Sequence, residues 1–75
     1  LSAQALVTVA RILGQRGEFT EADELVRQAL GMLPLNELPL RAEAHEVRGL
    51  CLRHLGKTVQ ALAELNHARR YAQET

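Results

Sequence analysis

The feature that most constrains this 75-residue chain is an internal repeat. When the sequence is shifted against itself by 39 residues, seven positions are identical, and they are Leu1/Leu40, Ala3/Ala42, Ala5/Ala44, Leu13/Leu52, Gly17/Gly56, Ala22/Ala61 and Ala29/Ala68. Some identities arise by chance in a chain rich in Ala and Leu. The glycine pair and the two later alanine pairs are the most informative, because they fall where helix ends and close helix contacts require small residues. The sequence therefore predicts two copies of one small supersecondary unit.

Each half of the chain predicts a helix, a tight turn and a second helix. Apolar residues recur with the spacing of one helical face. In the first segment these residues are Leu6, Val9, Ala10 and Leu13. Gly17 and Gly56 follow the first helix of each half, and glycine readily adopts the left-handed conformation that commonly ends a helix.

Polar residues and prolines indicate where the helices begin and end. We predict that Thr20 caps the second helix with Asp23 completing a capping box, and that Thr58 caps the last helix. Pro34 and Pro39 bracket a segment that cannot be helical throughout. The expected helices span residues 3–16, 20–33, 40–55 and 59–73.

The first half resembles a complete tetratricopeptide repeat, at Leu6, Val9, Ala10, Leu13, Gly17, Ala22, Val26, Ala29 and Pro34. The second half matches more loosely, at Gly49, Leu52, Gly56, Ala61, Leu65 and Ala68. The resemblance implies an all-α fold of two tandem antiparallel helical hairpins, a fragment of an α-α superhelix. It would form a single domain over residues 1–75, with one repeat at about 3–36 and the other at about 40–75.

The chain departs from the pattern of this family in three respects, the first of which is that it has only two copies of the repeat, whereas such arrays usually need about three. Its period is 39 residues, whereas the family period is about 34, so the loop between the repeats is longer by about five residues. His45 and Arg48 occupy positions where the family commonly has large apolar side chains. Together these two polar residues predict a loosely packed third helix.

Composition argues against several classes of protein. Nine basic and nine acidic residues cancel, so no net charge attracts nucleic acid or an anionic membrane. No apolar run reaches the roughly 20 residues of a membrane span. Cys51 is the single cysteine, which excludes an internal disulfide and fits a reducing, cytoplasmic location. The chain starts at Leu1 and shows no leader peptide, which suggests a piece of a longer protein.

The residues with reactive side chains do not form a recognisable active site. Cys51 and His54 lie three residues apart and would share a helix face, but a zinc site needs four ligands and no second pair at ligand spacing exists. His45 and His67 belong to no catalytic motif. We therefore expect no enzyme activity and no cofactor, and we expect Cys51 to be a buried structural residue.

The resemblance implies that the first helix of each repeat lines a groove that binds another protein or a peptide. The groove residues would be Gln4, Val7, Thr8, Arg11, Gln15, Glu43, Glu46, Leu50, Arg53 and His54. The alternative for these positions is that they are solvated polar residues of no specific role.

Two other functions remain open from the sequence. The arginine-rich composition and long period resemble helical-repeat regions of bacterial signalling proteins and transcription activators, which implies a sensor or regulatory segment. A helix-turn-helix DNA-binding domain fits short helices joined by glycine turns, but Glu64 and Glu74 accompany Arg69 and Arg70 on the last helix. That helix, residues 59–73, also has a second apolar stripe that includes Val59, so we expect self-association or further repeats to cover it.

Overall fold

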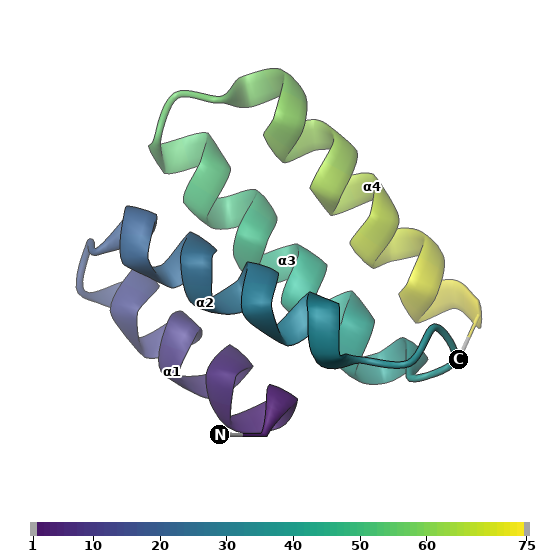
Figure 1. Cartoon of the computed structure of the whole chain (residues 1–75). Coiled ribbons are helices and arrows are strands. Elements are labelled where there is room, and N and C mark those ends of the chain that lie inside the picture. Colours follow the sequence, from purple (N-terminus) through teal and green to yellow (C-terminus); the bar gives the residue numbers. More distant parts are fainter. Residues whose placement is uncertain (1, 75) are drawn as a thin grey trace.

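The computed structural model describes residues 2–74 and is all-α over this range. Its four helices are α1 (Ala3–Gln15), α2 (Phe19–Met32), α3 (Leu38–His54) and α4 (Thr58–Glu74). Each boundary lies within two residues of the prediction. The helices form two consecutive hairpins, α1 with α2 and α3 with α4 (Figure 1). The predicted fold class is therefore confirmed.

Glycine ends the first helix of each hairpin in the same way. Gly17 and Gly56 have φ angles of 84° and 81°, the left-handed conformation that other residues rarely adopt. After each glycine the chain turns back onto its helix, because the Glu18 and Lys57 amides donate to the carbonyls of Leu13 and Leu52 at 2.9 Å. Both turns therefore arise from the repeated glycine.

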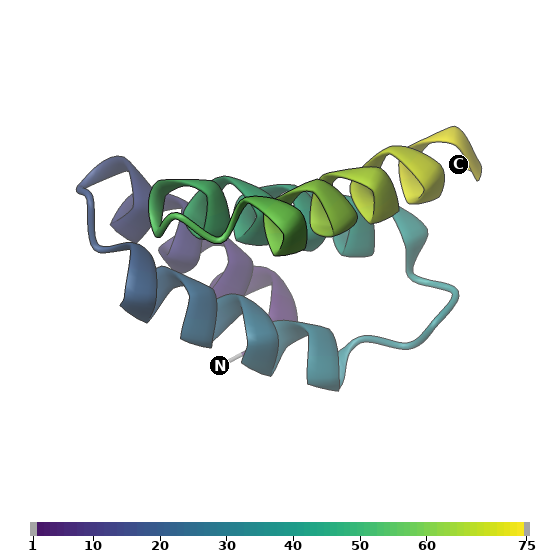
Figure 2. The same cartoon turned by 90° about the horizontal axis from the view of Figure 1, so that it is seen from above.

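The two hairpins pack against each other mainly through α2 and α3, and α1 also contacts α3 (Figures 1 and 2). A core of small and medium apolar side chains from α1, α2 and α3 lies within the first hairpin and at its junction with the second. It consists of Leu6, Val7, Ala10, Ala22, Val26, Ala29, Ala44, Val47 and Cys51. Over the described residues, none of the helices has the length and apolar character of a bilayer-spanning segment.

The predicted apolar face of α1 was partly wrong. Leu6 and Ala10 are buried as expected, but Val9 is 39% exposed, and Val7 is fully buried. The reason is that α1 contacts both α2 and α3, so its buried face is turned toward Val7. The pattern of one repeat predicts only which face of α1 packs on α2. The contact with the second hairpin determines how far the buried face of α1 is turned toward Val7.

The predicted N-caps were also wrong. The N-cap of α2 is Glu18, without a side-chain hydrogen bond, so Thr20 lies inside the helix and no capping box forms. Thr58 is the first residue of α4, one position later than a cap. A side-chain cap occurs instead at α1, where Ser2 Oγ accepts a hydrogen bond from the Ala5 amide at 3.1 Å.

Candidate binding groove

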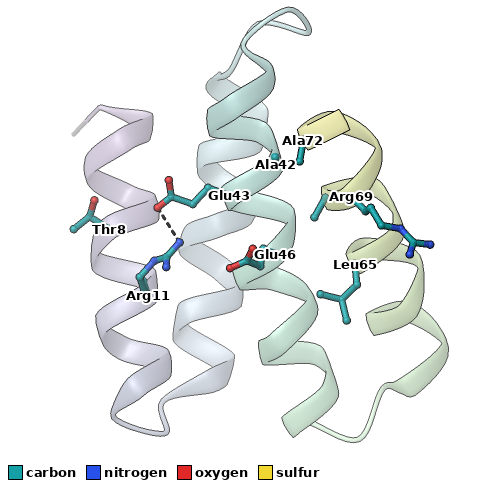
Figure 3. Close-up of a pocket in the computed structure, with 9 residues that line it drawn as sticks. Thr8, Arg11, Ala42, Glu43, Glu46, Leu65, Arg69 and Ala72 are labelled. Carbon is teal, nitrogen blue, oxygen red and sulfur yellow. Dashed lines mark hydrogen bonds and ion pairs between the residues drawn. The ribbon is translucent and has the colours of Figure 1, made fainter. Parts of the chain in front are cut away.

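A hollow lies over α3, with α1 on one side and α4 on the other (Figure 3). This central hollow has a volume of about 710 Å³. Its polar residues are Thr8, Arg11, Glu43, Glu46 and Arg69, and its apolar residues are Ala42, Leu65, Ala68 and Ala72. It thus combines apolar surface with a small number of charged side chains, as many ligand-binding sites do.

A second hollow continues along the other half of α1 and α3. Its volume is about 330 Å³, and Arg11 lines it as well as the central hollow. The Phe19 ring lies in this second hollow and stacks on His54, with 4.4 Å between the ring centroids and 2° between the planes. One face of the His54 ring is therefore already covered by α2.

Eight of the ten residues that the sequence suggests for the groove line one of the two hollows. They are Thr8, Arg11, Glu43 and Glu46 in the central hollow, and Arg11, Gln15, Leu50, Arg53 and His54 in the second. Gln4 is exposed on α1 but lines neither hollow. Val7 has no exposed surface, so its side chain belongs to the core and not to the groove.

Arg11 and Glu43 form an ion pair where the two hollows meet. Arg11 Nη2 donates to Glu43 Oε1 at 2.9 Å, from α1 to α3 (Figure 3). Both side chains are more than 40% exposed, so water screens the pair and its contribution to stability is small. The pair neutralises two charges of the central hollow, while Glu46 forms no ion pair with any described residue.

A partly buried ionic network joins the hairpins on the side of α3 that packs on α2 and α4. Arg48 donates from Nε to Asp23 Oδ1 on α2 at 3.1 Å, and from Nη1 to the Glu64 carboxylate on α4. Glu64 Oε2 also lies 2.5 Å from His45 Nδ1. The expected loose packing around His45 and Arg48 is replaced by these contacts, and Asp23 serves this network instead of a cap.

The environment of His45 favours its neutral form. Burial lowers the pKa of His45 below its ordinary value of 6.5, and this effect exceeds the opposite effect of the Glu64 carboxylate. His67 and Arg41 lower the pKa further. With Nδ1 engaged by Glu64, protonation would place the second proton on Nε2, which is buried and has no hydrogen-bond partner among the described residues.

Cys51 is buried, as predicted, with 2% of its surface exposed. Burial and the Asp23 carboxylate raise the pKa of its thiol, which keeps the thiol protonated and weakly reactive. Its sulfur lies 3.8 Å from where a Cβ on Gly14 would be, so it fills space between α1 and α3. The residue therefore acts as a small apolar side chain.

Sequence reasoning missed the structural role of Glu64, which entered only as an acidic residue on the last helix. A signal was present, because Glu64 lies three residues after Ala61 and four before Ala68. That spacing places it on the same face as two alanines that are both buried. A carboxylate on a buried face needs a partner, and the two unexpected polar residues on α3, His45 and Arg48, provide it.

Comparison with known proteins gave no match to a family model, to a curated protein or to a solved structure. The resemblance to tetratricopeptide repeats therefore depends on the residues of this chain and on their spacing.

Proposed function

We propose that the chain is a protein-interaction module that binds a short peptide segment in the central hollow. The observation that supports this proposal most is the position of the hollow: three helices line it, and it is open to solvent. Small side chains, Ala42, Ala68 and Ala72, leave the space into which a peptide side chain can enter. Leu65 supplies a larger apolar contact beside them.

The charges in the hollow indicate the kind of peptide. Arg11 and Glu43 neutralise each other, and the guanidinium of Arg69 points away from α3 in Figure 3. Glu46 remains as an exposed carboxylate without an ion-pair partner among residues 2–74. We therefore expect a ligand with a basic side chain next to a small apolar one, so that the base meets Glu46 and the apolar group meets Leu65.

Selection from a random peptide library on the immobilised chain, followed by calorimetry, tests this function. We expect the enriched peptides to combine Lys or Arg with an apolar residue. The Glu46→Arg variant should weaken their binding by about tenfold or more, because it places like charges together. Glu24→Arg makes the same charge change on the exposed surface of α2 and should leave the affinity unchanged. Selected peptides that bind Glu46→Arg as tightly as the parent chain would contradict the proposal.

The two alternatives from the sequence, a regulatory segment of a bacterial signalling protein and a helix-turn-helix DNA reader, remain predictions. No contact among residues 2–74 favours either of them.

A further inference from the structure

The 39-residue repeat relates the junction between the hairpins to the two outer edges of the molecule. The shift superposes α1 on α3 and α2 on α4 in sequence. The face of α2 that packs on α3 therefore has a counterpart on α4, and the face of α3 that receives α2 has a counterpart on α1. These two counterpart faces belong to the helices at opposite edges of the molecule (Figure 1).

At two of the counterpart positions the residues are apolar and exposed. Asp23 on α2 forms an ion pair with Arg48 on α3. The repeat places Leu62 of α4 at the position equivalent to Asp23, and Val9 of α1 at the position equivalent to Arg48. Leu62 is 58% exposed and Val9 is 39% exposed. A charged pair inside the molecule thus corresponds to two apolar side chains on its outer edges.

At a third position, too, a buried residue of the junction corresponds to an exposed apolar residue at the edge of the molecule. The shift relates Cys51, which is buried in the core between the hairpins, to Ile12 on α1. Ile12 is a larger apolar residue than Cys51, yet it is 48% exposed. Val9 and Ile12 lie three residues apart, so α1 presents two neighbouring apolar side chains on the face that corresponds to the receiving face of α3.

We propose that copies of this chain associate head to tail, with α4 of one copy packed on α1 of the next. In this arrangement Leu62 of one copy lies against Val9 and Ile12 of the other, in the register in which Asp23 lies against Arg48. Burial of these side chains removes apolar surface from water on both partners. Because the two faces differ, the contact is heterologous, and it extends into oligomers instead of stopping at a dimer.

The exposed residues at the two edges together indicate that the partner is another copy of this chain, bound head to tail. A symmetric pairing of α4 with a second α4 would cover Leu62 but leave Val9 and Ile12 exposed. Head-to-tail association covers all three and uses an interface geometry that the molecule already contains between α2 and α3. None of the three residues lines the central hollow, so this proposal and the proposed function can fail separately.

Sedimentation of the chain over a concentration series tests the association. We expect the average mass to rise with concentration beyond that of a dimer. Leu62→Glu and Val9→Glu should each remain monomeric, because each variant loses one of the two faces. A mixture of the two variants should form a pair with one copy of each and no larger species, since only one combination joins two intact faces.

A control variant and circular dichroism complete the experiment. Leu35 is 79% exposed and lies in the loop between the hairpins, so Leu35→Glu should assemble as the parent does. The helical content of both edge variants should equal that of the parent, because their side chains are exposed. A parent that is monomeric at every concentration would overturn the proposal, and so would a Val9→Glu variant that still assembles. A mixture of the two edge variants that forms no pair would overturn it as well.

Discussion

Arg48 connects three of the four helices through one side chain. It reaches Asp23 on α2 and Glu64 on α4 from the middle of α3, and only 28% of its side chain is exposed. Desolvation makes such an arrangement costly to form, but removal of one partner is costlier still, because the remaining charges stay buried and unpaired. The network therefore favours this one alignment of the hairpins over others.

Replacement of Arg48 by Met should destabilise the protein by about 3 kcal/mol, because it leaves the Asp23 and Glu64 carboxylates without their cation. Urea denaturation followed by circular dichroism measures the change. Addition of Glu64→Gln to this variant should restore part of the stability, since it removes one of the two carboxylates that have lost the Arg48 cation. Arg53→Met, at an exposed position of the same helix, should change stability by less than about 0.5 kcal/mol. Equal effects of the two arginine substitutions would show that the network contributes nothing.

His45 should make stability depend on pH in the mildly acidic range. Its pKa is lowered in the folded protein, so the unfolded chain takes up the proton first as the pH falls through 6.5. The free energy of unfolding should therefore decrease between pH about 7.5 and about 5.5. The His45→Gln variant, measured by denaturation at each pH, should show a smaller decrease, with His54 and His67 as the remaining histidines. A steeper loss in that variant would mean that burial does not favour neutral His45.

At the scale of the helices, glycine and alanine set the spacing within the second hairpin. A Cβ built on Gly49 would lie 2.7 Å from Leu65 Cγ and 3.4 Å from the Ala61 carbonyl oxygen. Ala61 and Ala68 are also nearly fully buried, so α3 and α4 approach closely along this line. In the first hairpin the fully buried Ala22 and Ala29 have the corresponding place in the repeat.

Two glycine-to-alanine substitutions should therefore have opposite effects. Gly31 in α2 has no atom within 4 Å of a built Cβ, so Gly31→Ala should stabilise the protein by about 1 kcal/mol through helix propensity. Gly49→Ala gains the same propensity but overpacks against Leu65, which costs about 1–3 kcal/mol, so we expect a net destabilisation of about 1 kcal/mol. Thermal melts of the two variants give the comparison. A Gly49→Ala variant as stable as Gly31→Ala would show that the helices are further apart.

The helices could be predicted from the sequence because their signals are local. Gly17 and Gly56 determine both tight turns by their own conformation, and Pro34 and Pro39 bracket the longer loop. The roles of the polar residues could not be predicted in this way. Asp23 has the spacing of a capping residue, but its partner Arg48 is 25 positions away in the sequence.

At the scale of the whole molecule, the second hairpin decides which residues are accessible. It buries Val7 and leaves most of the other suggested groove residues around the two hollows. The resemblance to tetratricopeptide repeats assigned the groove to the first helix of each repeat, α1 and α3, whereas residues of α4 line the central hollow as well. It could not predict the rotation of α1, because that depends on how the hairpins are stacked, or the role of Glu64, because that depends on the polar residues His45 and Arg48 of α3.

The central claim, that the two hairpins stack through α2 and α3 as one unit, can be tested by nuclear Overhauser effects between aromatic rings. The chain has one Phe and one Tyr, so both ring signals can be assigned without ambiguity. The Phe19 ring should show strong cross-peaks to His54, which report contact between the hairpins, and the Tyr71 ring should show cross-peaks to His45, which report contact within the second hairpin. Cross-peaks from Tyr71 to His45 without any from Phe19 to His54 would show that the hairpins form but do not stack as described.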